Sequence, residues 1–199
     1  GSNTPIQVSN LSGIISVAGG GGHSLALKHD GSVWAWGSNH FGALGNGDSI
    51  DSNVPVLLTQ LNQIIDISAG ASHSMALKSD GTVWEWGDYG PNVQPYSPLQ
   101  VNLNNVVAIS AGKHHCLALR NDGTVWSWGQ NINGVLGTGN ISGSITPVQV
   151  STLSDIVAIS SEGSYHCLAL KADGTLWAWG FNGYGALGNG SNIDSSIPI

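Results

Sequence analysis

The chain has 199 residues, of which 41% are hydrophobic, so it can bury a substantial core. Only 9% of the residues are charged, and the formal net charge is −7 with five Lys and Arg in all. Because nucleic-acid binding needs clustered cations that neutralise phosphates, this composition argues against such a partner, and no apolar segment is long enough to span a membrane.

The beginning of the chain offers little to interpret. Gly1-Ser2 looks like a remnant of cloning, so residues 1–3 are assigned to a tail, and no signal peptide is visible. The richness in Asn, Ser and Gly with little charge favours a bacterial secreted or cell-surface protein.

One segment recurs four times along the chain. It reads HSLALKHDGSVWAWG, HSMALKSDGTVWEWG, HCLALRNDGTVWSWG and HCLALKADGTLWAWG, ending at Gly37, Gly87, Gly129 and Gly180. A repeat of about 50 residues is one supersecondary unit that cannot bury its own apolar faces. The chain is therefore predicted to be an array of four units.

Each unit contains four short apolar runs in a fixed order. The first run follows a Pro, which sets the units at residues 4–54, 55–97, 98–146 and 147–199, the last including the start of a further unit. The third run alternates large and small side chains, with the period of two typical of a strand. An Asp-Gly pair before the fourth run supplies the positive φ of a tight hairpin. Four antiparallel strands per unit are predicted.

The third strand has no polar face. In the first unit His23, Leu25 and Leu27 form a large face, and Ser24 and Ala26 form a small one. A sheet of this kind packs its large face onto the small face of a copy around an axis, as the blades of a β-propeller do. The predicted fold is therefore all-β, with four propeller blades.

Residues that recur in every unit are assigned to the fold. They are His23, Trp34, Trp36, His73, Trp84, Trp86, His115, Trp126, Trp128, His166, Trp177 and Trp179. A metal or acid–base role for the histidines would have to exist four times, so their rings are expected to bond to backbone of their own blade. No metal, cofactor or catalytic residue is predicted.

The two cysteines are also read as structural. Cys116 and Cys167 occupy the small-face slot that holds Ser in the first two units. Equivalent slots of neighbouring blades are expected to lie too far apart for a disulfide, which requires Cα atoms within about 7 Å. Both are predicted to be free thiols.

The repeat G-x-x-H-S-L-A-L-K-x-D-G-x-V-W-x-W-G, followed by N-x-x-G-x-L-G, resembles that of the RCC1 (regulator of chromosome condensation) family. WD40 repeats are excluded by the missing Trp-Asp pair, and kelch repeats fit poorly. The resemblance covers Thr4 to Ile199 and implies a seven-bladed propeller of four-stranded blades that binds proteins without catalysis.

Four blades are too few for that ring. An open array leaves an apolar face at each end, larger than the few hundred Å² that monomers commonly expose. The run Ile197-Pro198-Ile199 is in phase with Thr4-Pro5-Ile6, which favours head-to-tail closure. We expect a homodimer of eight blades or, alternatively, part of a larger seven-bladed ring.

Binding is expected where the repeats differ, because positions shared by all units are explained by the fold. The second unit carries DYGPNVQPYS in place of the N-x-x-G-x-L-G loop, and the turns before the repeated His differ in units three and four. Aromatic side chains on stiff loops are typical of interface hot spots. The candidate binding residues are Asp88, Tyr89, Tyr96, Lys113, His114, Glu162, Tyr165 and Phe181. Glu85 is also unusual for its slot, whereas Phe41 and Tyr184 match the repeat and are read as packing residues.

The favoured hypothesis is a non-enzymatic interaction scaffold that self-associates through blade faces and binds a protein through these loops. Three alternatives remain. The first is an inhibitor-type propeller that binds an enzyme through aromatic loops. The second is a structural or engineered half-propeller without a ligand, and the third is a lyase or hydrolase with its site in the central channel. The last alternative rests on Asp66, because the equivalent positions of the other units hold the small residues Ser16, Ala108 and Ala158.

Overall fold

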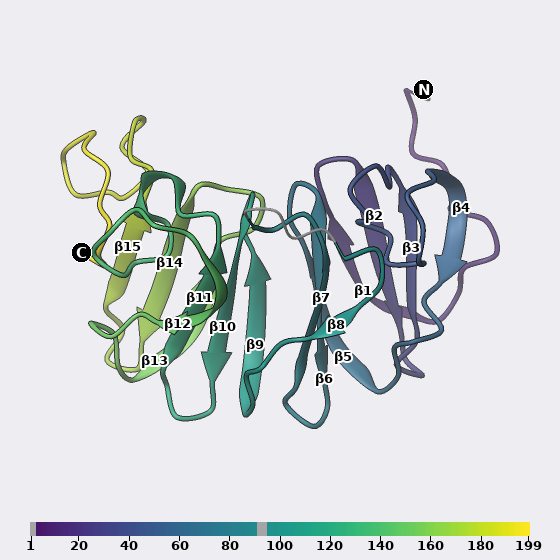
Figure 1. The fold of residues 1–199 in the computed structure, drawn as a ribbon, viewed down its shortest axis with the longest axis horizontal. Coiled ribbons are helices and arrows are strands. Elements are labelled where there is room, and N and C mark those ends of the chain that lie inside the picture. The colour runs from purple at the N-terminus through teal and green to yellow at the C-terminus, as the bar shows by residue number, and fades with distance from the viewer. Residues whose placement is uncertain (1–2, 91–94) are drawn as a thin grey trace.

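The computed structural model describes residues 3–90 and 95–199, and within them the strands form antiparallel sheets that follow one another across the molecule in chain order (Figure 1). The first blade contains β1 (Ile14–Gly19), β2 (His23–Lys28), β3 (Val33–Gly37) and β4 (Ser52–Leu57). The second contains β5 (Ile64–Ala69), β6 (His73–Lys78), β7 (Val83–Gly87) and β8 (Leu99–Gln100). The third contains β9 (Val106–Ala111), β10 (His115–Arg120), β11 (Val125–Gly129) and β12 (Ser144–Gln149). The fourth contains β13 (Ile156–Ser160), β14 (His166–Lys171) and β15 (Leu176–Gly180).

These sheets confirm the prediction of an all-β fold built of four propeller blades. Three of them have four strands, whereas the fourth sheet has three. Its outer edge is lined by the C-terminal segment, because Gly180 N donates to Ser195 O at 2.7 Å and Ala178 N donates to Ile199 O at 3.0 Å. The two chain ends lie at opposite ends of the row of blades (Figure 1).

The Pro-containing run belongs to a different sheet from the one we expected. We placed residues 55–58 at the start of the second unit, but β4 pairs with β3 of the first blade, with Leu57 opposite Trp34 and Val56 opposite Ala35. A repeat in sequence gives the length of a unit but not its starting point, which only backbone pairing decides.

The Asp-Gly hairpins have the predicted geometry. Gly31 between β2 and β3 has φ +79°, and the Asp30 carboxylate accepts hydrogen bonds from Ser32 N at 3.0 Å and Ser32 Oγ at 2.6 Å. The same bonds recur at Asp80, Asp122 and Asp173. Each turn is therefore closed by its own side chains.

Neighbouring blades pack large face onto small face, as predicted. We call the contacts between blades one and two, two and three, and three and four the first, second and third interfaces. At the first, Leu25, Leu27 and Val33 form one apolar cluster with Ala76 and Trp86 of the next blade. The other two interfaces repeat this arrangement. The core therefore lies between the blades.

The repeated histidines bond differently from our expectation. His23 Nε2 lies 2.9 Å from Ser74 Oγ, and His115 Nε2 lies 3.1 Å from Cys167 Sγ. The prediction that these rings bond to backbone of their own blade is wrong for both, because the large face on which they lie is covered by the next blade. Cys116 and Cys167 are free and buried, as predicted.

In three of the four blades, an Asn side chain holds the loop that follows the third strand. In the third blade Leu136 N donates to Asn131 Oδ1 at 2.9 Å, and Asn131 Nδ2 donates to Asn140 O at 2.9 Å and to Ser142 O at 3.0 Å. Asn39 and Asn182 hold the equivalent loops in the same way. This loop includes the short 3₁₀ turn η1 (Ile132–Gly134). No helix in the described ranges is long and apolar enough to cross a membrane.

The terminal blades leave their outward faces partly uncovered. At the last blade Leu170 is 37% exposed and Leu176 is 63% exposed, whereas Leu27 and Val33 in the same slots of the first blade are fully buried. At the first blade Trp36 is half-buried, whereas Trp86 in the same slot is fully buried. Both halves of a blade interface are therefore present at opposite ends of the chain.

Truncation of the same slot at an interface and at an end should have different costs. Leu27→Ala removes a fully buried side chain and should lower the free energy of unfolding by about 2–5 kcal/mol, measured by urea denaturation. Leu170→Ala, in dilute solution, should cost about 1 kcal/mol or less, because less burial is lost. Equal losses for the two variants would contradict the assignment of the core to the interfaces.

The Asn-held loop supplies a second test. Asn131→Ala removes all the hydrogen bonds of a buried side chain and should lower the free energy of unfolding by about 2–3 kcal/mol. The matched control is Asn133→Gly in the same loop, which removes the exposed bond to Asp194 and tolerates the φ of +61° at this position, so it should cost well under about 1 kcal/mol. Thermal unfolding of the two variants side by side distinguishes a structural Asn from an ordinary surface Asn.

Candidate protein-interaction site

The candidate residues belong to loops at one edge of the blades. Each turn before a repeated His and each loop after a Trp-Gly lie at the same end of their sheet, because the strands they connect are antiparallel. This end is the upper edge in Figure 1. Of the shortened loop at 88–97, residues 91–94 lie outside the described residues.

Three of the candidates come together between the third and fourth blades, and Asp88, on the loop after β7 of the second blade, lies near His114. Lys113 Nζ lies 4.5 Å from the ring centroid of Tyr165, a cation–π geometry, and the rings of His114 and Tyr165 are 6.3 Å apart. Lys113 N also donates to Ser164 O at 2.9 Å. Burial lowers the pKa of His114, while the nearby Asp88 carboxylate acts in the opposite direction. We call Asp88, Lys113, His114 and Tyr165 the Lys113 patch.

Two other aromatic candidates are accessible but lie elsewhere. Tyr96 is 42% exposed and covers the loop of the first blade, where its carbonyl accepts a hydrogen bond from Gly47 N at 2.8 Å. Phe181 is half-buried and meets Tyr184 edge-on, with ring centroids 5.8 Å apart. The candidates therefore form separate groups along the loop edge and not one continuous surface.

Tyr89 is not an exposed anchor. It is 4% exposed and packs in the apolar cluster of the second interface, so the structure contradicts its assignment to an exposed binding loop. Tyr89 occupies the slot of the buried loop Asn, two residues after the Gly that ends β7, just as Asn39 follows Gly37. Alignment with that slot is the signal that would have predicted its burial.

Two aromatics read as packing residues are accessible. Tyr184 is 93% exposed and Phe41 is 45% exposed, so the assignment of both to packing is wrong. Their slot in the third blade holds Asn133, a polar residue, and that substitution is the sequence signal for a surface position.

The channel side holds a polar cavity of about 390 Å³ between the first two blades and the turn of the fourth. Asp66, Glu162 and Ser68 contribute to its lining. Burial raises the pKa of Asp66, and the Glu162 carboxylate adds to this effect. Ser68 Oγ already accepts a hydrogen bond from Ala111 N at 2.9 Å. Within the described residues no three His, Cys, Asp or Glu side chains gather as a metal site.

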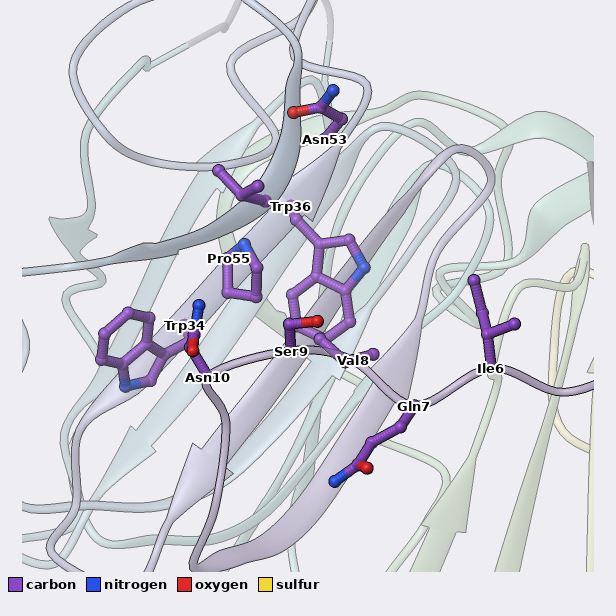
Figure 2. A pocket seen from close by; sticks show the side chains of 10 residues that line it. Ile6, Gln7, Val8, Ser9, Asn10, Trp34, Trp36, Asn53 and Pro55 are labelled. Atoms are coloured by element: carbon purple, nitrogen blue, oxygen red, sulfur yellow. The ribbon is translucent and has the colours of Figure 1, made fainter.

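An apolar hollow lies at the open end of the first blade. It has a volume of about 550 Å³, and the segment 6–10 crosses it in front of Trp34, Trp36 and Pro55 (Figure 2). In the second blade, Trp86 occupies the position equivalent to Trp36 and packs against the preceding blade. The hollow therefore occupies the place of a preceding blade.

Glu85 is the one buried acid at an interface among the described residues. It is 5% exposed on β7, where the other blades have Ala or Ser, and burial raises its pKa to about 7. Trp128 Nε1 donates a hydrogen bond to Glu85 Oε2. The sequence marked this residue as unusual without indicating its surroundings.

Comparison with known proteins agrees with this architecture. A family model for the RCC1-like domain matches residues 1–199. The ultraviolet-B receptor UVR8 of Arabidopsis thaliana is 33% identical over 98% of this chain and 36% of its own length. The structure of human WBSCR16 matches with a TM-score of 0.87 at 26% identity, covering 100% of this chain and 55% of that chain. Prp20p of Saccharomyces cerevisiae matches with a TM-score of 0.80 at 28% identity, covering 94% and 50%.

This chain thus spans about half the length of the solved relatives and about a third of UVR8. The match of sequence and structure over its whole length shows that the chain belongs to the RCC1-like domain family.

Proposed function

We propose that this chain is a non-enzymatic RCC1-like propeller scaffold for protein–protein interaction and that its open blade faces associate between two copies. The yeast relative has been solved bound to Kap60, and its binding to Gsp1p and histones has been described. Binding of proteins by a relative supports the general class of function. The self-association is argued from this chain's own end faces.

The complementarity of the two end faces carries this proposal. At the third interface Leu117, Leu119 and Val125 cover Cys167, Ala169 and Trp179 of the next blade. At the last blade, the positions equivalent to the first three residues hold Leu168, Leu170 and Leu176. At the first blade, the positions equivalent to the covered three hold Ser24, Ala26 and Trp36. A second copy can therefore repeat the interface that the chain already forms three times.

Polar groups at the ends match in the same way. Inside the chain, Trp179 Nε1 donates to Val135 O at 2.8 Å across the third interface. The equivalent carbonyl at the open end belongs to Ala186, and the equivalent indole belongs to Trp36. Joining the two ends gives the Trp36 indole an acceptor and covers the hollow of Figure 2.

The Lys113 patch is the proposed surface for a further protein. It presents Tyr165, a residue type enriched among interface anchors, beside a cation and a carboxylate at the loop edge. The channel cavity supports a lyase or hydrolase less well, because Ser68 is engaged by backbone and the carboxylates of Asp66 and Glu162 have no activated nucleophile beside them in the described residues.

Light scattering across a concentration series tests the self-association. The wild-type chain should approach twice its mass of 20.5 kDa. Leu170→Asp places a charge on the open face and should remain at the single-chain mass, because burial of an unpaired carboxylate opposes association. The control Ile145→Asp changes an exposed residue on the outer strand β12 and should associate like the wild type.

Circular dichroism of all three proteins checks that they are folded. A folded wild-type chain that stays at the single-chain mass at every concentration would contradict self-association and would assign the open faces to further blades of a longer chain.

A further inference from the structure

The first and third interfaces share one hydrogen-bond arrangement. At the first, Trp86 Nε1 donates to Ala43 O at 2.8 Å, and Ser74 Oγ donates to the same carbonyl at 2.9 Å. At the third, Trp179 Nε1 and Cys167 Sγ both donate to Val135 O, the sulfur at 3.4 Å. A carbonyl of the preceding blade's Asn-held loop thus satisfies two buried donors of the next blade.

The second interface satisfies the same two donors with a side chain. The second blade has no Asn-held loop, because Tyr89 occupies the Asn slot. Trp128 Nε1 instead donates to Glu85 Oε2, and Cys116 Sγ donates to the same oxygen at 3.9 Å. The Tyr89 hydroxyl is a further hydrogen-bond partner of the carboxylate. Glu85 and Tyr89 together replace the missing loop.

This replacement makes one interface titratable. A backbone carbonyl has no charge to gain, whereas a carboxyl group has two protonation states. Neither ion pair found in the described residues involves Glu85. No cation therefore compensates a carboxylate at this position, and a buried unpaired charge is unfavourable.

The buried titratable groups that contact Glu85 or Tyr89 remain neutral near neutral pH. Burial raises the pKa of Cys116 on β10 and of Tyr89. His73 on β6 meets the Tyr89 ring edge-on at 6.2 Å, and burial lowers its pKa to about 3. Asp88 lies farther out on the loop edge, beside His114. Glu85 is the member of this cluster whose charge changes between pH 5 and 8.

We propose that the contact between the second and third blades is a proton-controlled joint, held closed by the protonated Glu85 carboxyl and loosened when Glu85 becomes a carboxylate. The joint lies directly below part of the Lys113 patch, since Asp88 follows β7 and His114 precedes β10. Loosening it separates the blades that carry Asp88 and His114. The joint therefore couples pH to the geometry of that patch.

The direction of the pH dependence follows from linkage. The folded protein holds the Glu85 proton up to about pH 7, whereas a Glu in the unfolded chain loses its proton near pH 4.5. Stability from this group is fully present below the unfolded pKa and is lost as the pH rises to the folded pKa. The contribution of Glu85 to the folding equilibrium constant should fall by about 10- to 100-fold between pH 5 and 8 and level off above that. His23, His73 and His115 change the total stability in the opposite direction, because burial lowers their pKa to about 4, 3 and 3 and stability from them is gained as the pH rises.

Urea denaturation from pH 5 to 8 tests the joint in three proteins. The stability of the wild type relative to Glu85→Gln should fall by this amount, because the Gln amide oxygen still accepts from Trp128 but cannot ionise and the histidines contribute equally to both proteins. The control Asp155→Asn removes an exposed acid of the loop before β13, outside this interface, and should keep the wild-type profile. Equal profiles for the wild type and Glu85→Gln would overturn the proposal.

A direct titration keeps the proposal testable if Glu85→Gln does not fold. The carbon NMR shift of the Glu85 carboxyl in the wild-type chain should change with a midpoint near pH 7. Hydrogen exchange of the β7 and β11 amides, corrected for the intrinsic effect of pH, should accelerate over the same range. A midpoint at the ordinary value of a solvated Glu would contradict the buried joint.

Discussion

The structure depends on burial between the faces of neighbouring blades. Each sheet has one face of large aliphatic side chains and one of small residues and Trp, and neither face can remain in water at low cost. Fully burying a Trp removes roughly 150 to 250 Å² of surface from water, a gross gain of about 4 to 6 kcal/mol. Most of that gain offsets the entropy of ordering the chain, so a blade without neighbours is not expected to be stable. The exposed faces of the first and last blades follow from the same constraint.

Polar groups set how the faces meet. A buried indole N–H or hydroxyl without an acceptor is unfavourable, so each interface needs an acceptor at one defined place. Two interfaces use a loop carbonyl held by an Asn, and the second uses Glu85. The substitution keeps the packing and introduces a charge that responds to pH. The changed loop sequence of the second blade therefore alters the hydrogen bonds of Trp128 and Cys116 in the third blade.

Much of the fold could be predicted from patterns within one repeat. The alternation in segments such as His115–Leu119 predicts a strand with two buried faces, and the Asp-Gly pair predicts the hairpin after it, because both depend on neighbouring residues in sequence. The starting point of a blade could not be predicted in this way, since β4 pairs with the strand before it. The partners of His23 and His115 lie in another repeat, so no pattern within one unit shows them.

The candidate site was less predictable than the fold. Lys113, His114 and Tyr165 were found because they depart from the repeat, and the structure brings them together. The same criterion failed for Tyr89, which departs from the repeat to fill a buried slot. Departure from a repeat marks a changed environment, and only the packing shows whether that environment is surface or core.

Hydrogen exchange of the whole chain, read by strand at increasing protein concentration, tests the central claim most directly. If burial between blades stabilises the molecule, the amides of β6 and β10 should exchange slowly at every concentration, since both strands lie in inner blades. Those of β14 and β15 should exchange fast in dilute solution and become protected as the open faces associate. Equal protection of all four blades in dilute solution would contradict the account.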